Sequence, residues 1–112
     1  MSAASDDAPL GVFEEQVMLA VVRTAGDAYG MEVRREIERL TGRGVAIGAV
    51  YATLDRLEAK GLAESTRAGE GERSRRLFAV TPRGVRALAE TRAMRERLWQ
   101  GVDLGRLATE GG

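Results

Sequence analysis

The hydrophobic pattern of residues 47–81 changes its period at Gly61, and this change limits the folds that are open to the chain. Before Gly61 the apolar residues recur at helical spacing, and after it two short segments, 62–67 and 77–81, flank a polar, glycine-containing connection. The first pattern predicts a helix over residues 47–60, and the second predicts two strands. Glycine suits the end of a helix because it adopts the left-handed backbone conformation readily. The sequence therefore predicts a helix followed directly by a β-hairpin.

Further helices are predicted around this unit, over residues 11–24, 30–40 and 81–102. The turn segment AGDAYG separates the first two, and TGRG ends the second. Thr81 and Pro82 form a favourable helix start. The order helix, helix, helix, hairpin, long helix is that of a winged helix-turn-helix, a mainly α fold of the α+β class whose hairpin is the wing.

The 112 residues suffice for one domain, and neither a long linker nor a repeat divides them. We expect four parts in chain order: a flexible N-terminal tail over 1–10, the winged helix-turn-helix over 11–81, a C-terminal dimerisation helix over 82–104, and a flexible tail over 105–112.

The chain has no cysteine and no histidine. This excludes disulfides and thiolate metal sites, and it removes the commonest general base and metal ligand, so we expect no catalytic residues, cofactor or metal. The longest apolar run, near Val17–Val22, is too short to cross a bilayer. The acidic N-terminus lacks the basic segment of a signal peptide. We therefore expect a cytoplasmic protein without a membrane partner.

Positive charge is concentrated in the middle of a chain whose net charge is zero. Residues 1–42 carry a net −4, residues 43–86 a net +4, and residues 87–112 are balanced. An anionic partner should therefore meet the middle segment.

The predicted helix over residues 47–60 has two dissimilar faces. Ile47, Val50, Leu54 and Leu57 form the predicted core stripe. The opposite face is expected to carry small residues and two cations, namely Gly48, Ala49, Ala52, Thr53, Arg56 and Lys60. It could simply be a solvated surface, but such surfaces usually intersperse Glu with Lys. Small side chains instead allow a helix to enter the major groove of double-stranded DNA.

The predicted DNA contacts follow from this face and the wing. Ala49, Thr53 and Arg56 are expected nearest the bases, where Thr53 offers a hydroxyl and a methyl group. Phosphate contacts are expected from Tyr51, Lys60, Arg73, Arg75 and Arg76. The alternatives are a half-buried Tyr51 with its hydroxyl in solvent, and a merely solvated wing loop diluted by Glu70 and Glu72.

The last helix carries a broad apolar side that the small domain does not fully cover. We expect a two-fold homodimer in which this helix packs against the first helix and its own copy, although burial within one chain is the alternative. The expected dimerisation residues are Phe13, Val17, Leu88, Met94, Leu98, Trp99 and Val102. Trp99, the only tryptophan, is expected as an interface anchor, and a sharper hypothesis makes it the stacking surface for a small aromatic effector.

Three motifs resemble the PadR family of bacterial transcriptional regulators: YGMEV at 29–33, GAVYATLDRLEAKGL at 48–62 and ERSRRLFAVTPRG at 72–84. The resemblance covers roughly residues 11–102 and is closest to the short members with a single C-terminal helix. It implies a homodimeric winged-helix repressor of inverted repeats, in some members released by aromatic compounds. The sequence departs from a common family pattern with Ala52 in place of proline and Phe78 in place of tyrosine.

We therefore expect a sequence-specific DNA-binding repressor. The alternative is a winged-helix adaptor that binds only proteins. An enzyme is the least favoured class, because no convergent catalytic set is present.

Overall fold

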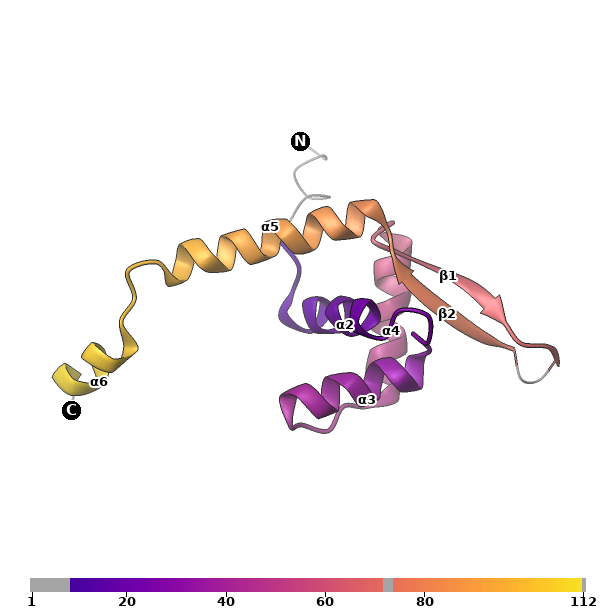
Figure 1. Cartoon of the computed structure of the whole chain (residues 1–112), viewed down its shortest axis with the longest axis horizontal. Helices are drawn as coiled ribbons and strands as arrows, with labels where there is room; N and C mark the ends of the chain where they lie inside the picture. The colour runs from indigo at the N-terminus through magenta and orange to yellow at the C-terminus, as the bar shows by residue number, and fades with distance from the viewer. Residues whose placement is uncertain (1–8, 72–73, 112) are drawn as a thin grey trace.

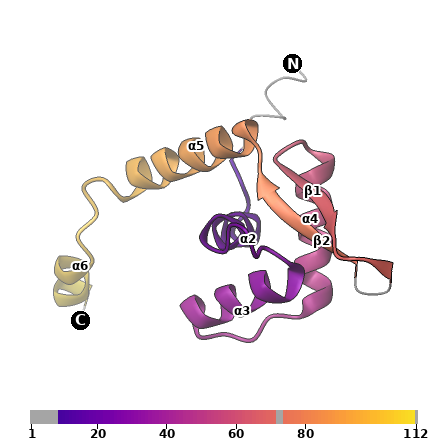
Figure 2. The same ribbon diagram turned by 45° about the vertical axis from the view of Figure 1, so that its right-hand side comes forward.

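The computed structural model describes residues 9–71 and 74–111 and confirms a mainly helical winged-helix fold (Figure 1). In chain order the elements are α2 (Val12–Arg23), α3 (Gly30–Thr41), α4 (Ile47–Ala59), β1 (Ala63–Ala68), β2 (Arg75–Val80), α5 (Pro82–Trp99) and α6 (Leu104–Gly111). Helices α2, α3 and α4 form one group, the β1–β2 hairpin projects to one side, and α5 carries α6 away to the other side (Figures 1 and 2).

The core lies between α2, α3 and α4 and is closed by the base of the hairpin. Its fully buried members include Met18, Ile37, Leu54 and Leu57, which come from all three helices. The strands are antiparallel, with Ala63 opposite Val80 and Ala68 opposite Arg75. Phe78 is buried in the core, and its backbone N–H donates to the Ala28 carbonyl at 3.0 Å. The wing is therefore tied to the segment that joins α2 to α3.

Helix α5 begins against the end of α4. The Thr81 hydroxyl accepts a hydrogen bond from the Gly84 backbone N–H at 3.1 Å and donates to the Gly61 carbonyl at 2.7 Å. Gly84 lies so close to the backbone of Leu62 that a Cβ on Gly84 would be 2.1 Å from the Leu62 carbonyl oxygen. The N-cap and this close approach together fix the direction in which α5 leaves the domain.

Both ends of the chain differ from the sequence-based expectation. Leu10, assigned to the N-terminal tail, is buried, and its backbone N–H donates to the buried Thr91 hydroxyl at 3.0 Å. The last long helix ends at Trp99, because Gly101 adopts a left-handed conformation with φ of 80°.

Most of the segment 105–112, expected as a tail, belongs instead to α6, which spans Leu104–Gly111. An Asp103 carboxylate oxygen accepts a hydrogen bond from the Arg106 backbone N–H at 3.0 Å, and an Arg106–Glu110 pair at 2.9 Å spans one turn. Residues 1–8 of the tail expected over 1–10 lie outside the described residues. Within the described ranges, no helix is long and apolar enough to cross a membrane.

Candidate DNA-binding surface

Helix α4 presents a surface of small side chains to solvent. Gly48, Ala49, Ala52 and Arg56 are all exposed, whereas Val50, Leu54 and Leu57 are buried in the core. The helix is anchored at its end by Gly61, whose φ of 77° lets the Leu62 N–H reach the Leu57 carbonyl at 2.9 Å. The predicted core stripe and the small exposed surface are both present.

The angle between α3 and α4 is fixed by side chains of α3. The Arg34 Nε donates to the Val45 carbonyl at 2.8 Å, and the Val45 N–H donates to the Glu38 carboxylate at 2.8 Å. Gly42 ends α3 in the left-handed conformation, with φ of 72°. The turn therefore holds Arg43 exposed beside the start of α4. The sequence analysis did not include Arg43 among the candidate DNA contacts, although a cation in the glycine turn TGRG beside the next helix could have indicated it.

The placement of Thr53 on the exposed face is corrected by the structure. Its side chain is only 1% exposed, because packing turns the core side of α4 further round than the apolar stripe alone indicates. The Arg56 guanidinium donates to the Thr53 hydroxyl through Nη2 at 3.1 Å. Thr53 therefore holds Arg56 in place and does not itself reach outward.

The Tyr51 side chain packs across the start of α3 but stays exposed. It is 39% exposed, and a Cβ on Gly30 would lie 2.4 Å from its Cζ atom. Gly30 must therefore lack a side chain for this ring to lie where it does. The contact joins Gly30 of the motif YGMEV to Tyr51 of the motif GAVYATLDRLEAKGL, and it leaves part of the ring at the surface.

Lys60, expected as a phosphate contact, is paired inside the chain. Its ammonium group donates to the Glu14 carboxylate at 2.8 Å, which joins the end of α4 to the start of α2. Burial raises the pKa of Glu14, but hydrogen bonds from Lys60 and the Gly11 backbone outweigh it and lower that pKa overall. Lys60 thus stabilises the domain and lies at the far end of α4 from Gly48.

The wing arginines have different surroundings. The Arg75 guanidinium lies over the Tyr29 ring, 3.9 Å from its centroid, and the side chain is exposed. The Arg76 guanidinium instead pairs with Asp55 at 2.8 Å and with Glu58 at 2.6 Å, both on α4. Arg73 lies outside the described residues. Tyr29, which sequence reasoning did not assign, is thus the partner of Arg75.

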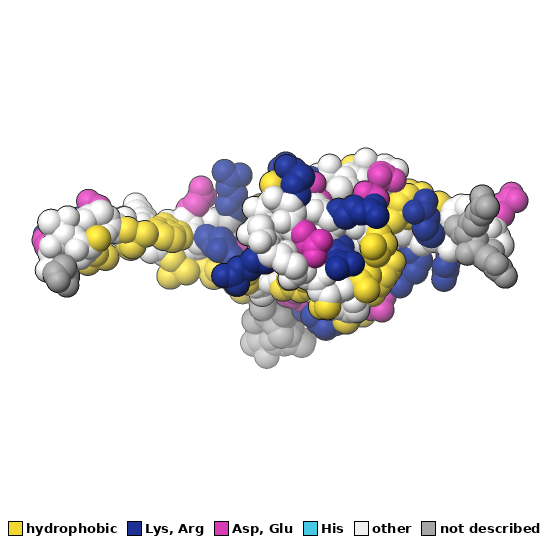
Figure 3. Space-filling model, turned by 90° about the horizontal axis from the view of Figure 1, so that it is seen from below, with side chains coloured by type: hydrophobic (Ala, Val, Ile, Leu, Met, Phe, Trp, Pro, Cys, Tyr) yellow, Lys and Arg dark blue, Asp and Glu magenta, His cyan; other side chains and the backbone are white. Residues whose placement is uncertain are grey.

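The expected dimerisation residues divide into two groups. Val17 is fully buried in the domain's own core, so its assignment to an interface is corrected. Phe13, Leu88 and Met94 are half-buried. Leu98 and Trp99 are 70% and 56% exposed, and Val102 is exposed beside them. Figure 3 shows hydrophobic side chains gathered along the α5–α6 end of the molecule, on the left.

Comparison with known proteins agrees with this geometry. The model of the Transcriptional regulator PadR-like family matches residues 18–90. The Transcriptional regulator Rv3488 of Mycobacterium tuberculosis (strain ATCC 25618 / H37Rv) is 37% identical over 97 residues, which is 85% of this chain and 90% of that protein.

Solved structures show the same fold. RosR of H. salinarum is 25% identical with a TM-score of 0.65, covering 91% of this chain and 88% of that one. The hsRosR-S4 complex is 26% identical with a TM-score of 0.65, covering 96% and 89%. Members of the matched family are transcriptional regulators, which confirms the expectation that the protein is not an enzyme. The chain belongs to the PadR-like family of transcriptional regulators.

Proposed function

We propose that the chain represses transcription as a homodimer that binds an inverted-repeat operator in the cytoplasm. The observation that carries the proposal is the exposed, small-residue face of α4 beside a wing that presents Arg75. A helix with small side chains enters the major groove of DNA, and an arginine-bearing wing reaches the adjacent backbone or minor groove.

Each exposed side chain has a role in this proposal. Ala49 and Arg56 face the base edges, and the hydrogen bond to Thr53 holds the Arg56 guanidinium ready for a guanine or phosphate. The exposed edge of Tyr51 and the Arg75 guanidinium contact phosphates. Arg73 is proposed as a further phosphate contact. Lys60 makes a smaller contribution than expected from sequence, because Glu14 holds its ammonium group.

The experiment is enrichment of genomic DNA fragments by the purified protein, followed by titration of the best fragment at several salt concentrations. Several phosphate contacts require a steep fall of affinity with salt, about 0.9 in the logarithmic slope for each phosphate. Failure to enrich any fragment at low salt would overturn the DNA-binding proposal and favour the adaptor alternative.

A pair of variants separates base readout from phosphate contact. Arg56→Ala should change which base is preferred at one or two operator positions, with a cost of about 1–3 kcal/mol. Arg75→Ala should weaken all sequences evenly and reduce the salt slope by about one contact. If both variants bind like the wild type, α4 is not the reading helix.

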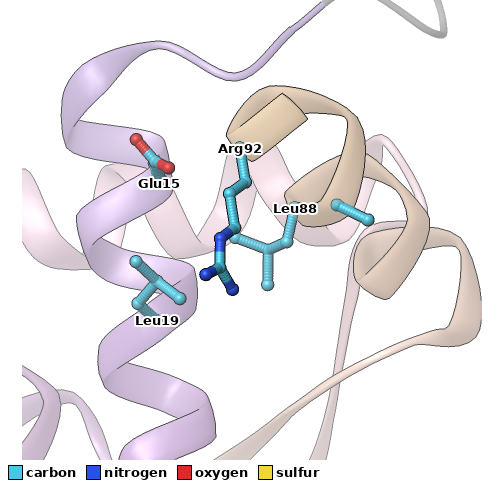
Figure 4. A pocket seen from close by; sticks show the side chains of 5 residues that line it. Glu15, Leu19, Leu88 and Arg92 are labelled. Atoms are coloured by element: carbon cyan, nitrogen blue, oxygen red, sulfur yellow. The ribbon is translucent and has the colours of Figure 1, made fainter. Parts of the chain in front are cut away.

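The homodimer is supported by two apolar surfaces that the chain leaves open. One is a groove of about 400 Å³ between α2 and α5, lined by Glu15, Leu19, Leu88, Ala89 and Arg92, whose side chains converge from the two helices (Figure 4). The other is the apolar side of the α5–α6 end, with Leu98, Trp99, Val102 and Leu104 together. A two-fold axis lets the second surface of each copy cover the first surface of the other.

The dimer is tested by the mass in solution. One chain has a mass of 12.1 kDa, so light scattering at micromolar concentration should give about 24 kDa. A mass of one chain at that concentration would contradict the dimer while leaving DNA contact by α4 open.

We further propose that a small aromatic effector binds at Trp99, between the two protomers. A shallow hollow of about 250 Å³ is lined by Leu98, Trp99, Val102 and Leu104, and its walls are almost entirely apolar. A flat ring stacked there should quench the fluorescence of Trp99, the only tryptophan, and weaken DNA binding in the same concentration range. Titration with 4-hydroxycinnamic acid that changes neither signal would argue against this class of effector.

A further inference from the structure

Arg76 sits in a network that joins the wing to α4. Its Nη1 lies 2.8 Å from an Asp55 carboxylate oxygen, and its Nη2 lies 2.6 Å from a Glu58 carboxylate oxygen. The Ser65 hydroxyl of β1 donates to the Glu58 carboxylate at 2.9 Å, and the Arg76 Nε points at the same hydroxyl from 3.5 Å. The network therefore connects both strands of the wing to one side of α4.

The Arg76 guanidinium also packs against an aromatic ring. It lies 4.7 Å from the centroid of the Phe78 ring, and Phe78 is buried in the core. The Arg76 side chain is 28% exposed, which is low for an arginine on a projecting hairpin. The Arg76 guanidinium directs N–H donors at two carboxylates and a hydroxyl, so few donors are left for a phosphate.

Asp55 and Glu58 are the two acids of α4, and Asp55 lies on its exposed side. Unpaired carboxylates there would repel the phosphates of a bound duplex. Hydrogen bonds from Ser65 and Arg76 lower the pKa of Glu58, so this acid stays charged and needs a cation beside it. Arg76 meets that need for both acids.

We propose that Arg76 is a positioning residue, which fixes the wing against α4 and offsets Asp55 and Glu58, and that it does not contact DNA. The neighbouring Arg75 makes no ion pair with a described residue and supplies the phosphate contact. This inference rests on the proposed binding of DNA by α4 and the wing. It assigns opposite roles to two adjacent arginines.

The experiment compares Arg76→Ala with Arg75→Ala on the duplex that the wild type enriches most from a random-sequence pool. Arg75→Ala should lower the salt slope by about 0.9, the value for one lost phosphate contact. Arg76→Ala should weaken binding by about tenfold, the size of a lost charged hydrogen-bond network, and part of this loss is repulsion of the phosphates by Asp55 and Glu58. The salt slope is therefore compared in the Asp55→Asn/Glu58→Gln background, where Arg76→Ala should leave it unchanged, and a slope lowered by one contact there would overturn the inference.

A double-mutant cycle with Glu58→Ala separates positioning from a general loss of affinity. If Arg76 acts through the network, Arg76→Ala should cost clearly less in the Glu58→Ala background than in the wild type. Equal costs in the two backgrounds would contradict the proposal. Hydrogen exchange of Arg76→Ala should be faster than that of the wild type in the backbone amides of the wing and unchanged in those of α2. Faster exchange in α2 as well would identify general destabilisation.

Arg76→Lys covers the case in which the alanine variant does not fold. Lysine keeps the charge but does not bridge two carboxylates in a fixed fork. It should therefore bind more weakly than the wild type with the same salt slope, and wild-type affinity would overturn the inference. Failure of the wild type to enrich any duplex is a separate outcome, because it removes the proposed function itself.

Discussion

The winged-helix domain and the C-terminal arm, residues 96–111, differ in how far their side chains are buried. The domain has a buried core of large apolar side chains, and some of its cations pair across elements, as Arg23 does with Glu36. In the arm every residue from 96 to 110 is exposed. Its described ion pairs, Arg92–Glu96 and Arg106–Glu110, stay within one helix. The domain is thus folded against itself, whereas the apolar side chains of the arm stay exposed in the single chain.

Helix α6 makes this difference plain. It has eight residues, and Leu104 and Leu107 lie on one side of it, both exposed. A helix this short is marginal in water without tertiary packing. Its apolar side continues the exposed surface formed by Leu98 and Trp99. The comparison therefore predicts large stability effects of mutations at the domain side and mainly assembly effects at the arm.

The largest effect is expected at the joint between the two regions. Gly84→Ala places a Cβ 2.1 Å from the Leu62 carbonyl oxygen, so the backbone must shift, at a cost of about 2–3 kcal/mol in the free energy of unfolding. Urea denaturation gives this value. The matched control is Gly48→Ala, where no heavy atom lies within 4 Å and helix propensity should add about 0.5–1 kcal/mol of stability. Equal midpoints for the two variants would contradict the close approach.

The second-largest effect is expected from a substitution in the arm, which should change dimerisation and leave the domain folded. Leu98→Asp puts a charge on an exposed apolar side chain of the arm. Sedimentation should show a shift from dimer towards the 12.1 kDa chain, because an unpaired charge is costly in an apolar interface. Circular dichroism of the variant should keep the helical signal of the domain. A stable dimer of Leu98→Asp would place the interface elsewhere.

A moderate effect is expected from acid on the domain side. Hydrogen bonds from Arg39 and then Arg23 lower the pKa of Glu36 from 4.5 to about 2. A lowered folded-state pKa gives stability that is present above 4.5 and is lost as the pH falls towards 2. Glu36→Gln should remove this part of the acid dependence between pH 5 and 2. A carboxyl titration midpoint near 4.5 in the folded protein would refute the pairing.

The smallest effect is expected for an ion pair on the surface of α5. Arg92 and Glu96 are both largely exposed and lie one helical turn apart, with 3.8 Å between the Arg92 Nε and a Glu96 carboxylate oxygen. Such pairs contribute about 0.3–0.5 kcal/mol. Glu96→Ala should therefore shift the thermal midpoint by no more than a few degrees at equal protein concentration. A much larger loss would show that Glu96 takes part in the dimer.

Much of the fold was predictable because its signals are local. The stripe of Val50, Leu54 and Leu57, the turn at Gly61 and the Thr81 N-cap each act within a few residues. Thr53 was misplaced because the direction of burial around α4 depends on the packing of neighbouring elements. Helix α6 was missed because the glycine-rich end of the chain at 109–112 indicated a tail.

The candidate site was less predictable, because a charged side chain does not reveal its partner. Lys60 pairs with Glu14 across 46 positions, and Arg76 pairs with Asp55 across 21 positions. The sequence by itself determined the order of elements from α2 to α5 and the family, through periodicity, turn residues and motifs. Only the tertiary structure decided which cations pair within the chain, as Lys60 and Arg76 do, because ion pairs form between residues that folding brings together.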